Sequence, residues 1–284
     1  MLVPLMNATF MRRITRPRRG RATRKLLGPL SFALAALGGL AGCHTPGPGH
    51  VYAWCPAAPA TVQDLDAQQN VPPVAISGRV NAGENVVGLA YDFNTDFLCL
   101  RLEPGAHVRI FKRGENRFVR EWALPAELAA PERPATLATG LALAVRPQDR
   151  RLFALHPAKP EIWEFTLDGQ FVRAIALAPL PPAALGGLAF DHVYNRLVAL
   201  LATTPARLVE IAPDGSWTPL ATLSSDEVAP TSLGCNGDAG EYYVPLATGG
   251  VGVFDRRGAL VRRLALAGNA AALAAGPRAF LRVF

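Results

Sequence analysis

A pattern of apolar segments and polar turns recurs between residues 88 and 266, and it constrains the fold more than any other feature of the chain. The stretch 87–102, VGLAYDFNTDFLCLRL, returns most clearly at 187–201 as GLAFDHVYNRLVALL. Looser copies start at 140 and 232, so the four copies start 52, 47 and 45 residues apart. Each copy divides into four strand-like segments, because short apolar runs alternate with turns that contain Gly, Asp or Asn.

The third and fourth segments of each copy are joined by a tight turn that contains glycine. Glycine adopts positive φ without a steric penalty, and Asp-Gly is a strong hairpin signal. Three of the fourth segments also share an apolar-Val-Arg sequence. The turns are Arg113-Gly114, Asp168-Gly169, Asp214-Gly215 and Arg257-Gly258, and the shared sequences are Phe118-Val119-Arg120, Phe171-Val172-Arg173 and Leu260-Val261-Arg262. A four-stranded unit at this period predicts the blades of a β-propeller.

The two ends of the repeat region supply one more blade. Residues 74–80, VAISGRV, have the character of a fourth strand that precedes the first complete copy. The stretch 270–284 offers a first strand, AAALAA, and a second, FLRVF, while HVYAWC at 50–55 is a candidate third strand. Pairing of N- and C-terminal strands would remove the exposed sheet edges of an open ring. We therefore predict an all-β protein: a β-propeller of four-stranded antiparallel blades, five by this count, closed by its N- and C-terminal strands.

Two copies carry the sequence G-L-A-[YF]-D, at 88–92 and 187–191, followed by an apolar strand and then by the turn and F-V-R sequence described above. This pattern resembles that of NHL-type and related six-bladed propeller lipoprotein families over roughly residues 74–284. The resemblance implies six blades as the alternative count. It implies little about activity, since such propellers include binders, scaffolds and enzymes.

The N-terminal 42 residues contain eight basic side chains and no acidic one. Their basic part is followed by an apolar segment at 26–40, which is short for a membrane span and typical of a secretory signal. The segment ends in Leu40-Ala41-Gly42-Cys43, which resembles the bacterial lipobox. The resemblance implies cleavage before Cys43 and lipidation of its thiol, and His44 at the next position favours the periplasmic face of the outer membrane. An ordinary cysteine beyond a normal cleavage site is the alternative.

These observations divide the chain into three parts. Residues 1–42 form a lipoprotein signal peptide, 43–73 a Pro/Gly-rich tether, and 74–284 the β-propeller. We expect several acyl chains on one cysteine to anchor the protein stably.

The formal net charge of +7 comes from the signal peptide. Without it, 21 basic residues stand against 22 acidic ones. No basic surface is expected on the mature chain, so we expect no nucleic-acid partner. Cys55, Cys99 and Cys235 remain, as buried thiols or as one disulfide with a spare thiol, and their spacing matches no zinc motif. We expect no metal and no cofactor.

The topology of a propeller decides how polar residues near the strand ends are interpreted. The first strand of each blade lines the channel, and the turn after it lies on the lower face. Asp92 and Asp191 follow first strands, so we expect their carboxylates to accept hydrogen bonds from turn N–H groups. The recurring Arg120, Arg173 and Arg262 are interpreted as solvated charges on outer strands, which discourage edge-to-edge pairing.

The loops of the opposite, upper face are the candidate binding surface. The longest connection, 125–138, lies there, and long loops on a rigid scaffold often carry recognition. We expect His107 and His156 to be solvated loop histidines and predict no catalytic residue. The candidate binding residues are Glu103, His107, His156, Lys159 and Arg207.

The sequence thus predicts a lipid-anchored periplasmic module that binds a protein or glycan. The alternative is a metal-dependent hydrolase of the lactonase or phytase-like esterase type, and a third interpretation is a purely structural envelope protein. Lactonase-like propellers need converging acidic and amide ligands. The first strands here offer Val, Gly, Leu, Ala and Tyr, with only Glu84 and Asn85 near a channel entrance, and Asn236 and Asp238 near the lower turn.

Overall fold

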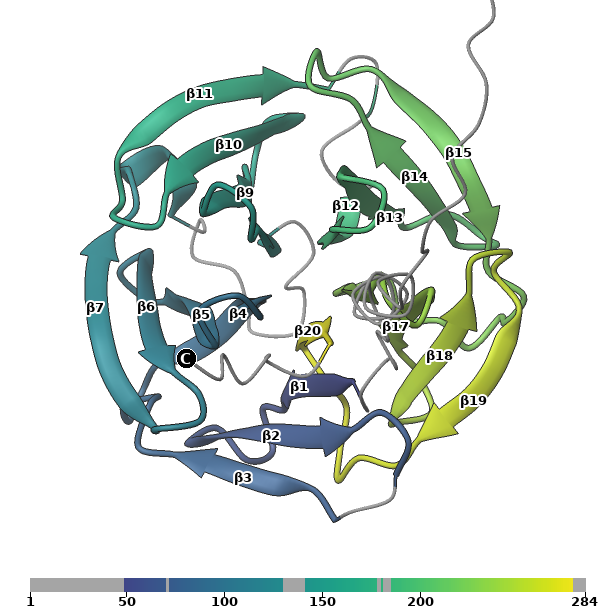
Figure 1. Ribbon diagram of the computed structural model, residues 1–284, viewed down its shortest axis with the longest axis horizontal. Helices are drawn as coiled ribbons and strands as arrows, with labels where there is room; N and C mark the ends of the chain where they lie inside the picture. The colour runs from purple at the N-terminus through teal and green to yellow at the C-terminus, as the bar shows by residue number, and fades with distance from the viewer. Residues whose placement is uncertain (1–48, 70–71, 130–140, 178–179, 181–184, 278–284) are drawn as a thin grey trace, which may run out of the picture. The chain divides into compact units, whose positions relative to one another are not determined.

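The computed structural model describes residues 49–69, 72–129, 141–177, 180 and 185–277. These residues form five four-stranded antiparallel sheets, which are the blades of a β-propeller (Figure 1). Within this part of the chain the helical structure consists of the 3-10 turn η2 (Ala126–Leu128), and no helix is long and apolar enough to cross a membrane.

We number the blades along the chain and give the strands of each from the channel outward. Blade 1 contains β4 (Asn85–Asp92), β5 (Phe97–Glu103), β6 (His107–Lys112) and β7 (Arg117–Ala123). Blade 2 contains β8 (Leu143–Arg146), β9 (Arg151–Leu155), β10 (Glu161–Thr166) and β11 (Phe171–Ala176). Blade 3 contains β12 (Leu185–Asp191), β13 (Arg196–Leu201), β14 (Arg207–Ile211) and β15 (Trp217–Thr222). Blade 4 contains β16 (Gly234–Asn236), β17 (Glu241–Pro245), β18 (Val251–Asp255) and β19 (Leu260–Leu264). Blade 5 contains β20 (Ala272–Gly276), β1 (His50–Trp54), β2 (Thr61–Asp66) and β3 (Val74–Ser77).

The innermost strands close a ring. In that ring β4 borders β8 and β20, β12 borders β8 and β16, and β16 borders β20. The prediction of five blades closed by N- and C-terminal strands is confirmed, because β20 pairs antiparallel with β1 from His50 opposite Gly276 to Trp54 opposite Ala272.

The composition of blade 5 differs from the expectation in two ways. HVYAWC supplies the second strand, β1, and not the third. The third strand is β2, TVQDLD, in the segment interpreted mainly as a tether, so the propeller begins before Val74. The stretch 61–66 looks polar because it has only two large apolar side chains, Val62 and Leu65, yet both are buried. FLRVF lies outside the described residues.

Five hydrophobic clusters fill the spaces between neighbouring blades. Side chains alternate across a strand, so each blade contributes to two clusters. In β5, Leu98 and Leu100 face blade 5, whereas Cys99 between them faces blade 2. Both faces of the inner strands are therefore apolar. This explains why the sequences of these strands are continuous apolar runs and do not alternate between apolar and polar residues.

We use the word seam for the contact between the outer strand of one blade and the third-to-fourth turn of the next blade. The outer strands follow one another around the rim, and each ends beside such a turn (Figure 1). Four seams are crossed by an arginine, so the interpretation of this row as solvated charge is incomplete: Arg120 and Arg173 are 45 % and 43 % exposed, yet each also contacts the next blade. Arg79 donates to Asn116, Arg120 pairs with Asp168, Arg173 donates to the carbonyl of Pro213 (3.1 Å) and Arg262 to that of Ala67 (3.0 Å).

The glycine turns at these seams are confirmed in three blades. Gly169, Gly215 and Gly258 have φ of +89°, +85° and +83°. In blade 1 the positive φ belongs to Asn116 (+45°) in place of Gly114. The backbone N–H of Gly114 instead donates to the Asp96 carboxylate at 2.7 Å, which fixes this turn by a different contact.

Candidate functional site

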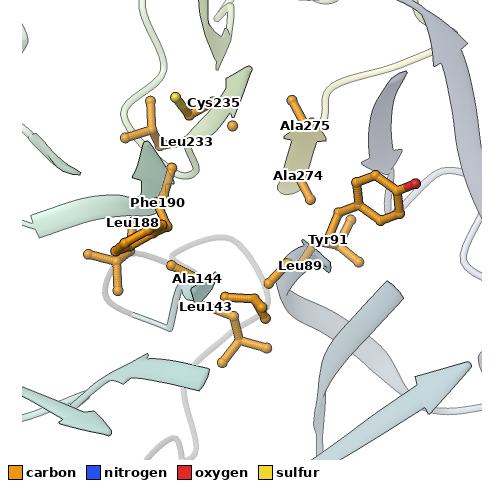
Figure 2. A pocket seen from close by; sticks show the side chains of 14 residues that line it. Leu89, Tyr91, Leu143, Ala144, Leu188, Phe190, Leu233, Cys235, Ala274 and Ala275 are labelled. Atoms are coloured by element: carbon orange, nitrogen blue, oxygen red, sulfur yellow. The ribbon is translucent and has the colours of Figure 1, made fainter. Parts of the chain in front are cut away.

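The central channel is narrow, and the side chains that line it are almost all apolar. Its cavity of about 30 Å³ is lined by the first strands of all five blades (Figure 2) and has the volume of roughly one water molecule. The Tyr91 hydroxyl is turned away from the channel centre and donates to Asp96 at 2.9 Å. Burial raises the pKa of the Cys235 thiol well above its ordinary value, so this side chain is not a reactive nucleophile. Among the described residues, the channel therefore presents little volume and no cluster of ionisable side chains to a small substrate.

The lower mouth of the channel is covered by Phe93. Its ring lies 4.5 Å from that of His192, although the two residues belong to blades 1 and 3, which are not neighbours in the ring. His192 Nε2 in turn lies 2.9 Å from a carboxylate oxygen of Asp238 in blade 4. Asn236 ends β16 and Asp238 lies in the lower turn that follows, as predicted.

Asp92 and Asp191 have the structural role expected of them. Asp92 accepts hydrogen bonds from the backbone N–H of Asn94 (3.0 Å) and from the Thr95 hydroxyl (2.6 Å). Asp191 accepts from the backbone N–H groups of Val193 and Tyr194. Burial raises the pKa of Asp92, and these hydrogen bonds oppose that effect.

Glu84 does not face the channel and instead belongs to a charged cluster on the outer half of blade 1. Both terminal guanidinium nitrogens of Arg109, Nη1 and Nη2, donate to its carboxylate, at 2.7 and 2.9 Å. These hydrogen bonds lower the pKa of Glu84 to about 2. Arg109 also donates to Glu121 at 2.5 Å, and His107 Nε2 lies 3.4 Å from the Glu84 carboxylate. His107 is thus packed against an ion-paired network.

His156 is buried, and the expectation of a solvated loop histidine is wrong. It is 5 % exposed, and its Nδ1 accepts hydrogen bonds from the backbone N–H groups of Ala158 and Lys159, both at 3.0 Å. Two donors at Nδ1 require a neutral ring with its proton on Nε2, and burial accordingly lowers the pKa of His156. The reason for the difference is local: the loop folds back over its own histidine.

Sequence reasoning missed Arg101, a fully buried residue beneath the long connection of the upper face. Its guanidinium donates to the carbonyls of Leu155 (2.8 Å), Leu141 (3.3 Å) and Leu128. Burial lowers its pKa to about 10, so the group stays charged. Arg101 thereby holds both described ends of that connection against blade 2. The single charge within the apolar run FLCLRL was the available signal.

The five candidate residues occupy the same end of blades 1, 2 and 3 and do not form one compact site. Glu103 ends β5 and His107 begins β6, so the two flank one loop. His156 and Lys159 flank the corresponding loop of blade 2, and Arg207 is exposed at the start of β14. Of the connection 125–138, residues 130–138 lie outside the described residues.

The upper face also has a hollow of about 480 Å³ over blade 4, which the sequence did not suggest. It lies between the loop at Thr248, Gly249 and Gly250 and the connection 263–269. Arg263 and Thr248 both donate to Glu227 at its edge, at 2.5 and 3.1 Å, and the Arg263 contact lowers the pKa of Glu227. The paired glycines at 249–250 were its only sequence signal.

In the described part of the chain, no group of three or more His, Cys, Asp or Glu side chains is placed to hold a metal ion. The acidic residues that the hydrolase interpretation would need are used in ion pairs and turns. No observation here favours that alternative.

No family model matches the chain, and no curated protein matches it in sequence. Solved structures do match. A chain in the crystal structure of the nidogen/laminin complex is 12 % identical, with 80 % of this chain and 98 % of that chain covered and a TM-score of 0.55. A protein of unknown function from Bacteroides caccae is 10 % identical over 81 % of this chain and 99 % of that chain, with a TM-score of 0.48. Likeness at such low identity concerns the fold alone, and the match to the chain of the nidogen/laminin complex agrees with the β-propeller.

Proposed function

We propose that the chain is a lipid-anchored binding or scaffold module of the cell envelope, which engages a protein partner through the loops of its upper face. The observation that carries the proposal is a contrast of volumes. The channel holds about 30 Å³ between apolar walls, whereas the upper-face hollow over blade 4 holds about 480 Å³. A rigid ring that encloses no substrate site and presents loops around an open hollow is suited to recognition of a surface.

A protein partner fits the chemistry of this face. The hollow combines glycines of positive φ, Gly249 and Gly250, with an ion-paired edge, Arg263–Glu227, that a partner's charged groups can approach. Lys159 of blade 2 and Arg207 of blade 3 are exposed cations on the same face. The propeller of similar fold in the nidogen/laminin structure belongs to a protein complex, which agrees with such a role without assigning it.

The partner test uses photo-crosslinking in intact cells. A benzophenone amino acid at Thr248 is expected to give a discrete protein adduct, whereas the same group at Ser216, in the third-to-fourth turn of blade 3, is expected to give none. Replacing residues 125–138 with a short linker is expected to weaken the adduct. Adducts of equal yield at both positions, or none at Thr248, would refute the upper-face assignment, and a glycan that protects Thr248 from crosslinking would redirect it to glycan binding.

The anchor is tested separately by metabolic labelling with palmitate. The wild-type chain is expected to incorporate label and to fractionate with the outer membrane, and Cys43→Ala is expected to lose both properties. Unchanged labelling of the variant would refute lipidation at this residue.

The hydrolase alternative predicts that calcium stabilises the protein. We expect the same melting temperature with calcium and with a chelator. A calcium-dependent rise of several degrees would return the enzyme to consideration and argue against a pure binding role.

A further inference from the structure

The N-terminal end of the described domain emerges beside the lower mouth of the channel. His50 pairs with Gly276 at the end of β20, and a Cβ on Gly276 would lie 2.9 Å from the Tyr91 ring. A Cβ on Gly49 would lie 2.4 Å from the amide nitrogen of Asn236, the last residue of β16. The chain therefore leaves the propeller close to its axis, on the face that carries the first-to-second turns.

The length of chain before this exit limits the distance to the anchor. Five residues lie between Cys43 and Gly49, which makes six residue-to-residue steps. An extended residue spans at most about 3.6 Å, so a lipid on Cys43 would hold the exit within roughly 20 Å of the membrane. A connection this short would keep the lower face closer to the bilayer than the upper face.

The lower face carries an exposed aromatic side chain that is held in place by cations. Tyr194 is 53 % exposed and its neighbour Val193 is 48 % exposed. The guanidinium groups of Arg196 and Arg256 lie 4.6 and 4.5 Å from the centre of the Tyr194 ring. Arg256 also donates to the Tyr194 hydroxyl at 2.7 Å and to the carbonyl of Gly237. Tyr194 thus protrudes into solvent in a fixed orientation.

Further cations lie on neighbouring turns. Arg150, in the first-to-second turn of blade 2, and Arg257, in the third-to-fourth turn of blade 4, are both exposed. Neither side chain forms an ion pair within the described residues, in contrast to Arg113 and Arg196. Their charge is available to an anionic surface.

We propose that this patch (Val193, Tyr194, Arg150, Arg256 and Arg257) rests on the anionic phospholipid surface to which the chain is anchored, an inference that depends on the proposed lipidation of Cys43. Tyrosine is enriched where membrane meets water, and basic side chains near an anionic surface are attracted to it. The anchor makes the contact intramolecular, so a weak contact suffices. The ring is then held flat on the bilayer, with the upper-face loops directed toward a partner.

The test measures which face lies at lipid depth in the full, lipidated protein, reconstituted into vesicles of phosphatidylethanolamine and phosphatidylglycerol. An environment-sensitive fluorophore is placed on Val193→Cys and, as control, on Lys159→Cys of the upper face. Cys55, Cys99 and Cys235 are buried and do not compete for label. Lipids carrying a nitroxide quencher are expected to quench the lower-face probe at least threefold more than the upper-face probe.

A charge-reversal pair tests the electrostatic part. With the probe on Val193→Cys, Arg257→Glu is expected to reduce quenching at least twofold, and Arg207→Glu on the upper face is expected to leave it unchanged. Equal effects of the two reversals would overturn the role of the lower-face cations.

The two proposals fail in different ways. Protein that does not sediment with vesicles although Cys43 is intact would show that the anchor is wrong. Protein that sediments but shows equal quenching at the two probes would overturn only the orientation, and would indicate that the patch around Tyr194 serves another partner.

Discussion

Four seams of the propeller are crossed by an arginine, and the seam between blades 3 and 4 uses a different contact. There the backbone N–H of Ser224 donates to the carbonyl of Gly258, and the Ser224 hydroxyl accepts from the N–H of Leu260, both at 2.9 Å. A hydroxyl and a peptide group thus replace a long cation. The same two surfaces are joined in both cases, so the repeat requires contact at the seam and not one particular chemistry.

The outer strand of blade 3 also differs in the position of its bulge. In blade 2, Arg173 lies opposite Glu164, and Val172 is the extra residue that has no partner. Blades 1 and 4 have the same arrangement at Arg120 and Arg262. In blade 3 the bulge comes two residues later, and Thr218 lies opposite Glu210. A bulge redirects the next side chain. The F-V-R sequence therefore aims an arginine at the seam.

Turn glycines are common to seams with and without arginine, and they should give the largest effects. A Cβ on Gly215 would lie 1.8 Å from the carbonyl oxygen of Ala176, and one on Gly258 would lie 2.2 Å from that of Thr222. We expect Gly215→Ala and Gly258→Ala each to lower the free energy of unfolding by about 2–4 kcal/mol. Gly78→Ala is the matched control, because Gly78 has φ of +71° and no atom within 4 Å of the added carbon. Its expected loss is about 1 kcal/mol. Urea unfolding measures all three, and equal losses would show that strain of the backbone, and not the seam, is responsible.

The arginines that cross the seams differ in the burial of the carboxylate with which each one forms an ion pair. Glu164 is 3 % exposed and accepts from Arg173 at 2.7 Å and from Arg146 at 3.0 Å. We expect Arg173→Met to cost about 1–3 kcal/mol, since a buried carboxylate loses one of two donors. Arg120→Met should cost about 0.5 kcal/mol or less, because its partner Asp168 is exposed to solvent. Chemical denaturation gives the free energy of unfolding of both variants. A larger loss of stability in Arg120→Met than in Arg173→Met would contradict this expectation.

The stability contributed by the seam between blades 5 and 1 should depend on pH. Arg109 links Glu84 to the carbonyl of Arg79, the residue that crosses this seam. Glu84 has a pKa of about 2, below its ordinary 4.5. Its contribution is therefore complete above about pH 4.5 and is lost as the pH falls toward 2. We expect Glu84→Gln to destabilise the protein by about 1–3 kcal/mol at pH 7, with the difference from wild type vanishing near pH 2. Unfolding curves across this range check it, and a difference that does not change with pH would exclude the ion pair as its source.

The features that could be predicted from the sequence are those that depend on residues close together along the chain. Hairpin turns, strand segments and the hydrogen bonds of Asp92 and Asp191 all follow from local signals, and these repeat. Blade 5 was harder, because its four strands come from both ends of the chain and β2 has few apolar residues. No periodicity joins such segments.

The sites of contact between distant segments were predicted least well. The burial of Arg101 and His156 depends on how a connection folds over the strand ends, and spacing alone carries no information about this. The hollow over blade 4 similarly arises where two separate loops meet. The contacts of Arg120, Arg173 and Arg262 could not be predicted because each arginine contacts the next blade. For the first two the contacted residue lies about 40 to 50 residues further along the chain, and for Arg262 it lies across the closure of the ring.

The smallest expected effect comes from restoring an arginine to the seam between blades 3 and 4. Thr218 is exposed and lies opposite Glu210, in the register that places Arg173 opposite Glu164. We expect Thr218→Arg to stabilise the protein by less than about 1 kcal/mol, because Glu210 is partly exposed and already lies 3.4 Å from Arg196. Thr218→Gln, which adds length without charge, is the control in the same unfolding assay. If both variants have the same stability, the ion pair contributes nothing at this seam, and Ser224 with its two hydrogen bonds is sufficient to join blades 3 and 4.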